Sequence, residues 1–277
     1  MLIKCWGSRG STPVSGRQYL RYGGDTTCIQ VTAKSGENVI IDAGTGIRKL
    51  GQSLGSASTS CLVLTHAHFD HVAGFNFFKP LFQQGSVVEI QNSCFSGVTV
   101  EKILTTLMSP PLFPICPKDL KATIRFRTDL CGTFSIGSLT VETIPLNHPN
   151  GGFGFLFTEE GKRFVFLTDN ELGFDHGQGT DFQDYLAFAG DADLLFHDAE
   201  FTPEEYKMRG GWGHSTYTSA LDLALQSGAK RLGLFHLNQN RTDVQMDEIQ
   251  AECRSRIRSA GSNLECFGVA CNTAFIL

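Results

Sequence analysis

The segment that most restricts the fold of this chain is a short apolar run, Cys61–Thr65, which three histidines and an aspartate follow at once. Desolvating so many polar groups at the end of a strand is costly unless they bind something. His66 and His68 lie two residues apart and so point to the same side of an extended chain. Asp70 and His71 can face a second point nearby as the chain turns into a helix. This spacing favours two metal ions that share one cleft.

The rest of the sequence alternates between apolar runs and helical patterns. The runs are rich in Val, Ile, Phe and Thr and end at Gly, Pro, Ser or Asp, which is typical of strands. Strands are predicted at Leu2–Gly7, Cys28–Ala33, Val39–Asp42, Cys61–Thr65, Val87–Gln91, Thr123–Thr128, Leu139–Ile144, Gly154–Thr158, Arg163–Thr168, Asp193–His197, Arg231–His236 and Glu265–Val269. Helices are predicted at Val98–Met108, Asp181–Ala189, Thr216–Gln226 and Asp243–Ala260. This mixture indicates a layered α/β (α+β) fold.

One stretch stands out as irregular. Ser109–Pro117 has proline at four of its nine positions, which forbids a regular helix or a central strand. Because the patterns on either side continue, we interpret it as a stiff surface loop that either covers the site, reaches a partner or has no further role. No other segment suggests a boundary, so we expect one domain over residues 1–277.

Composition limits the classes of function. Hydrophobic residues make up 41% of the chain and charged residues 18%, which excludes a disordered protein. The formal net charge of -5 argues against a protein whose main role is gripping nucleic acid. No signal peptide or membrane-spanning run is apparent, and the nine scattered cysteines fit buried thiols in a reducing compartment. We therefore expect a cytoplasmic protein without a membrane partner.

The segment HAHFDH resembles the HxHxDH signature of the metallo-β-lactamase-fold hydrolases, which are four-layer αββα sandwiches. The resemblance extends along the chain, because later apolar runs end at or just before His148, Asp169 and His236, where that family carries its remaining ligands. It implies one metal held by His66, His68 and His148, and another held by Asp70, His71 and His236. Asp169 would bridge the two. Zinc is the expected metal, with manganese and iron as alternatives, since imidazole and carboxylate ligands suit all three.

Further segments are similar to the phosphodiesterase side of the family, which includes tRNase Z, the phosphoribosyl cyclic phosphodiesterases and the anti-Pycsar cyclic-nucleotide phosphodiesterases. They are Gly7–Pro13 with Tyr22–Cys28, Leu195–Phe201, and Gly213–Thr216. The resemblance implies that Asp70 orients the nucleophile and that His214 is the general acid. Asp198 is the predicted support of His214, and Glu200 is the alternative.

These resemblances predict a dinuclear-metal-dependent phosphodiesterase. It would hydrolyse a small, cyclic nucleotide-like phosphodiester by means of a metal-bridging hydroxide. The alternatives are a tRNA 3′-end processing endonuclease, a thioester hydrolase of the glyoxalase II kind, and a metal-dependent sensor. A large RNA partner is not expected, because the sequence shows no basic, Gly/Pro-rich arm and is acidic overall. A homodimer is compatible with the sequence.

The remaining histidines and the cations receive plainer interpretations. His176, in a glycine-rich loop, is predicted to be solvated, and His197, at the end of an apolar run, to be a hydrogen-bonded core residue. Four basic residues could reach a phosphate group. They are Arg9, Lys49, Arg209 and Arg241.

Overall fold

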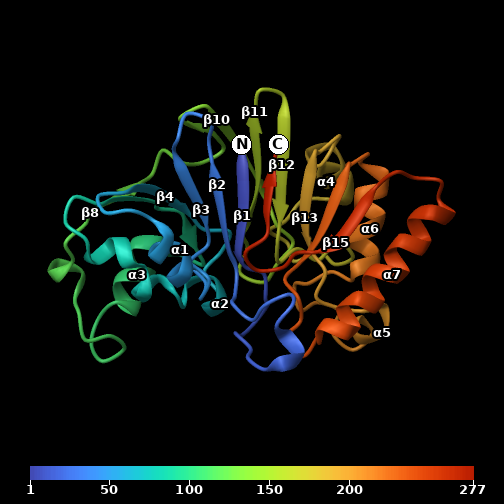
Figure 1. Ribbon diagram of the computed structural model, residues 1–277, viewed down its shortest axis with the longest axis horizontal. Coiled ribbons are helices and arrows are strands. Elements are labelled where there is room, and N and C mark those ends of the chain that lie inside the picture. The colour runs from blue at the N-terminus through green and yellow to red at the C-terminus, as the bar shows by residue number, and fades with distance from the viewer.

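The computed structural model describes residues 1–277 and contains two large sheets that pack face to face (Figure 1). The first sheet has the order β16 (Ala274–Ile276), β1 (Leu2–Gly7), β2 (Cys28–Thr32), β3 (Asn38–Ile41), β4 (Thr59–Val63), β5 (Val87–Gln91), β8 (Thr123–Arg127). The second has the order β15 (Glu265–Gly268), β14 (Arg231–Phe235), β13 (Leu194–Asp198), β12 (Lys162–Leu167), β11 (Phe153–Glu159), β10 (Leu139–Pro145), β9 (Thr133–Ile136). A small hairpin joins β6 (Cys94–Phe95) to β7 (Val98–Thr99).

Helices cover the two outer faces of the paired sheets (Figure 1). Those on the side of the first sheet are α1 (Ile47–Ser53), α2 (Phe69–Val72) and α3 (Val100–Leu107). Those on the side of the second sheet are α4 (Phe182–Phe188), α5 (Pro203–Tyr206), α6 (Tyr217–Gln226) and α7 (Asp243–Ser259). The predicted αββα sandwich is therefore confirmed. No helix has both the length and the apolar character that crossing a bilayer requires.

The alternation of side chains along the strands explains the layers. In β12, Phe164 and Phe166 point into the core between the sheets, whereas Val165 and Leu167 join the core beneath the helices. The period of two in a strand places successive side chains on opposite faces. Because β12 is apolar on both faces, it can lie in the middle of a sandwich with helices outside.

The predicted element positions largely agree with the structure. The helix expected at Val98–Met108 begins two residues later, because residues 98 and 99 belong to β7 and Thr99 caps the helix. The capping box expected at Thr242 and Gln245 is present at the start of α7. The short elements α1, α5, β9 and β16 were not predicted. Residues 109–117 form a loop after α3, as predicted.

Parallel pairing determines where the functional side chains meet. Strands β3, β4, β5 and β8 run parallel to one another, and so do β12, β13, β14 and β15. Parallel strands end at the same edge of a sheet, and in α/β folds this carboxyl edge is where ligands bind. The segments after β4, β12 and β14 therefore bring their polar residues to one place.

Candidate metal centre

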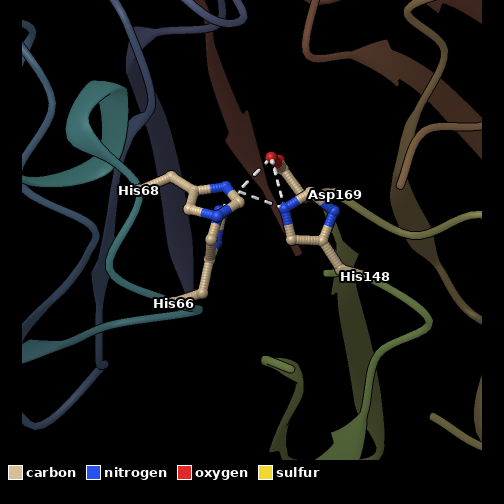
Figure 2. A group of neighbouring side chains, drawn as sticks. All are labelled: His66, His68, His148 and Asp169. Carbon is tan, nitrogen blue, oxygen red and sulfur yellow. Dashed lines mark hydrogen bonds and ion pairs between the residues drawn. The ribbon is translucent and has the colours of Figure 1, made fainter. Parts of the chain in front are cut away.

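Asp169 lies between two groups of histidines, and Figure 2 shows the first of these groups. One carboxylate oxygen, Oδ2, is 3.4 Å from His66 Nε2 and 3.7 Å from His148 Nε2. The other oxygen, Oδ1, is 3.4 Å from His71 Nε2 and 3.3 Å from His236 Nε2. A single carboxylate thus faces two separate sets of nitrogen atoms, which is the arrangement of a bridging ligand.

Two further side chains complete the sets. His68 Nδ1 lies 2.9 Å from His148 Nε2 in the first group. In the second group, Asp70 Oδ2 lies 3.3 Å from His71 Nε2 and 3.2 Å from His236 Nε2. The structure therefore brings together all seven residues for which the sequence predicted a ligand role.

The chemistry of these groups fits divalent metal ions. His66 Nε2 and His71 Nε2 are buried and have no hydrogen-bond partner, although leaving such an atom unpaired is costly. Burial lowers the pKa of His148 to about 3, so its ring is neutral at pH 7, the form in which imidazole binds a metal. Imidazole and carboxylate donors suit zinc, manganese and iron alike.

The outward-facing nitrogen atoms of the histidines have fixed partners. Asp42 Oδ2 lies 2.8 Å from His71 Nδ1, and the same carboxylate accepts hydrogen bonds from the amide and hydroxyl of Thr65. The Gly213 carbonyl oxygen is 2.9 Å from His148 Nδ1. Such partners fix the tautomer and the orientation of a ligating histidine. They hold Nε2 of both rings toward Asp169.

The backbone of three site residues is strained. Asp42, Asp169 and His236 follow β3, β12 and β14 and have φ angles of 64°, 56° and 53°. This left-handed region costs a non-glycine residue about 1–2 kcal/mol and is concentrated at functional sites. Each of these turns comes at a residue whose side chain contacts the proposed ligands.

His214 stands beside the second group of ligands. Its Nδ1 is 2.7 Å from Asp198 Oδ2, and its ring stacks on His236 with centroids 4.7 Å apart. Glu200 instead holds His236 Nδ1 at 3.0 Å and lies 3.5 Å from His214 Nε2. Burial lowers the pKa of His214, but the charges of Asp198 and Glu200 raise it to about 9. Asp198, and not Glu200, is thus the carboxylate that contacts His214 Nδ1.

Glu171 is a residue of this region that the sequence analysis missed. Its buried carboxylate accepts hydrogen bonds from Tyr206 Oη at 2.6 Å and from the amides of Gly211 and Gly213 at 2.7 Å. His176 Nε2 lies 2.9 Å from the same carboxylate, so the prediction that His176 is solvated was wrong. The only sequence signal was an acid placed two residues after Asp169. His197 is buried and hydrogen-bonded, as predicted.

Replacing Glu171 by alanine should lower the free energy of unfolding by about 3 kcal/mol, because one buried and several part-buried donors would lose a charged acceptor. Urea denaturation measures this change. The control is Glu204→Ala, which removes an exposed carboxylate and should cost less than about 0.5 kcal/mol. Equal stability losses in the two variants would show that the Glu171 contacts do not hold this region.

The structure also separates the four basic residues that the sequence offered for phosphate. Arg9 is buried and donates to three backbone carbonyl groups. Lys49 pairs with Asp25 at 2.7 Å, and Arg241 pairs with an acidic side chain. The side chain of Arg209 has neither a hydrogen bond nor an ion pair and lies over the Phe201 ring. Only Arg209 has a cation without such a partner.

Comparison with known proteins agrees with this architecture. Residues 37–237 match the model of the beta-lactamase superfamily domain. The ribonuclease Z of Gemmatimonas aurantiaca is 25% identical, over 92% of this chain and 91% of that protein. Among solved structures, the metallo-beta-lactamase fold protein YhfI from Bacillus subtilis has a TM-score of 0.71 at 15% identity, covering 99% of both chains. The short form of human tRNase Z has a TM-score of 0.66 at 18% identity, covering 100% of this chain and 99% of that one.

The chain therefore belongs to the beta-lactamase superfamily. Within it, the protein is a metal-dependent hydrolase with the metallo-β-lactamase fold.

Proposed function

We propose that the protein hydrolyses a small, cyclic nucleotide-like phosphodiester. The observation that carries this proposal is the position of the His214–Asp198 pair directly against a dinuclear ligand set. Bridging ligands alone would serve many hydrolytic reactions. A histidine with an unligated Nε2, held through Nδ1 by a buried carboxylate, adds a proton donor for an alkoxide leaving group.

The proposed ligands form two sets, which correspond to the two groups of side chains around Asp169. His66, His68 and His148 would hold one ion, Asp70, His71 and His236 would hold the other, and Asp169 would contact both. When bound, two divalent cations would make hydroxide available near neutral pH and would offset negative charge on a phosphoryl oxygen. Zinc is the metal that we propose, and manganese or iron would fit the same donors.

The protein's own groups would then position water and move the proton. Asp70 accepts a hydrogen bond from the Ser11 amide at 2.8 Å, which fixes its carboxylate so that it can orient the attacking water. As the bond from phosphorus to the leaving oxygen breaks, His214 Nε2 would give its proton to that oxygen. Asp198 would keep the ring in place and stabilise its positive charge before the transfer.

A second candidate is tRNA 3′-end processing. The observation in its favour is that a relative named ribonuclease Z aligns over more than nine-tenths of both chains. The net charge of -5 favours the small substrate, because RNA affinity depends largely on cationic contacts with phosphate.

A substrate panel tests the two candidates together. The protein, loaded with zinc or with manganese, is given nucleoside cyclic phosphates, cyclic dinucleotides, a precursor tRNA and a thioester. We expect hydrolysis of at least one small cyclic diester, with little activity on the thioester. Cleavage of the precursor tRNA alone would favour RNA processing, and hydrolysis of the thioester alone would refute phosphodiesterase activity.

A further inference from the structure

Large apolar side chains lie exposed on the segment that leads into His214. Trp212 is 62% exposed and Met208 is 86% exposed. Phe174, which is 47% exposed, lies beside Gly211, so a side chain at position 211 would contact the Phe174 ring. Trp212 is two residues from His214, and two peptide units span no more than about 7 Å. The Cα atom of Trp212 therefore lies close to that of the proposed proton donor, and its side chain is exposed.

This segment is anchored to the site. The Glu171 carboxylate binds the amides of Gly211 and Gly213 on either side of Trp212. The Gly213 carbonyl oxygen in turn contacts His148 Nδ1. The backbone at Trp212 is thus tied both to a buried acid and to a proposed metal ligand. Met208 and Trp212 are thus exposed on a backbone that is held in place, and contiguous exposed apolar patches mark interaction sites on soluble proteins.

A cation without a partner lies on the same segment. The Arg209 guanidinium is 5.4 Å from the centroid of the Phe201 ring. That ring and the His214 ring form a T-shaped pair with 5.8 Å between centroids. Because Arg209 has no acidic partner, it can attract an anion without first breaking an ion pair. A flat aromatic surface and an available guanidinium on one segment match the two parts of a nucleotide, its base and its phosphate.

We propose that residues 208–213 form the substrate-recognition surface, in which Trp212 stacks on a nucleobase and Arg209 attracts the phosphate charge. This inference rests on the proposed function and narrows it to diesters that carry a base. Diesters of a sugar without a base are excluded as the preferred substrates, because they would leave Trp212 without a stacking partner. Stacking of a base on an aromatic side chain corresponds to roughly 5- to 150-fold in affinity.

A matched pair of substrates tests the stacking role. KM and kcat are measured for a nucleoside 2′,3′-cyclic phosphate and for the corresponding ribose 2,3-cyclic phosphate without a base. Trp212→Ala should raise KM for the nucleoside substrate by about 10- to 100-fold and leave the base-free one unchanged. Trp212→Phe, which keeps an aromatic face, should recover most of the loss. Equal effects of Trp212→Ala on both substrates would overturn the proposal.

Arg209→Gln has a different expected signature. Because both substrates carry the same phosphate, this variant should raise KM for both by a similar factor, on the order of 10-fold. An unchanged KM for both substrates would remove Arg209 from the recognition surface. Metal content, measured in every variant, should equal that of the wild-type protein.

A direct binding measurement keeps the inference separate from catalysis. The chain has two tryptophans, and Trp6 is 5% exposed, so Trp212 is the one that a ligand can reach. A nucleoside monophosphate should quench the tryptophan fluorescence of the wild-type protein but not of Trp212→Ala, and ribose 5-phosphate should quench neither. Failure of the wild-type protein to hydrolyse any small cyclic diester of the panel would refute the proposed function. Absence of quenching would refute the base-binding surface.

Discussion

Asp169→Ala is expected to lose metal from both groups and to lower kcat/KM for a phosphodiester by on the order of 10³-fold or more. The reason is that this one carboxylate faces both ligand sets, with Oδ2 toward His66 and His148 and Oδ1 toward His71 and His236. No other carboxylate takes that position between the two sets. Metal content per chain and steady-state kinetics on the purified variant measure the two effects.

Asp169→Asn is the matched control for this prediction. Asparagine tolerates the left-handed backbone that Asp169 adopts, so local strain should not rise. It keeps one oxygen but replaces the other with an amide that cannot ligate. We therefore expect Asp169→Asn to retain metal at one of the two groups. Its metal content should lie between that of the wild-type protein and that of Asp169→Ala. Full occupancy in both variants would show that Asp169 is not a bridging ligand.

His214→Ala should behave in the opposite way, keeping its metal while losing turnover by about 10²- to 10⁴-fold. His214 contacts Asp198 and stacks on His236, but the proposed ligand sets do not include it. Metal analysis and kcat on an alkyl-type diester test this separation. Loss of metal together with activity would indicate that His214 is a ligand.

The leaving group provides the sharper form of this test. Nitrophenolate leaves without being protonated, whereas the alkoxide of a ribose needs a proton as its bond to phosphorus breaks. His214→Ala should therefore lose far less activity on bis(p-nitrophenyl) phosphate than on a cyclic nucleotide. Asp198→Asn, which weakens the support of Nδ1 but leaves His214 in place, should show the same pattern with a smaller loss. An equal loss on both substrates would contradict a proton-donating role.

Sequence reasoning was effective where a strong local pattern met the end of a strand. His66 and Asp169 each follow an apolar run, and although the two runs lie in different sheets, they end at the same side of the sandwich, where the two side chains meet. The alternation of strand and helix patterns predicted a layered α/β fold, and the resemblance of HAHFDH to the metallo-β-lactamase-fold signature predicted the αββα sandwich. The start of α7 was predicted correctly because the capping box of Thr242 and Gln245 marks it.

The features that were missed depend on tertiary contacts. Glu171 could not be interpreted from its neighbours in sequence, because three of its four partners lie 35, 40 and 42 residues further along the chain. The left-handed backbone of His236 has no sequence signature, because the usual signal of a positive φ is a glycine and this position holds a histidine. The short helix α1 has too few residues for its period to be distinguished from a loop.

The apolar layer between the sheets has a meaning for the site as well as for the fold. His66 and Asp70 come from the half of the molecule built on the first sheet, whereas Asp169 and His236 come from the second. The gap that separates these halves is filled by side chains such as Phe166, three residues before Asp169. The phenylalanine rings in this layer determine how far apart the two sheets lie, and with that the spacing of the ligands. A substitution that changes the ring volume in this layer is therefore expected to change the distances between ligands of the two halves, although it replaces no ligand.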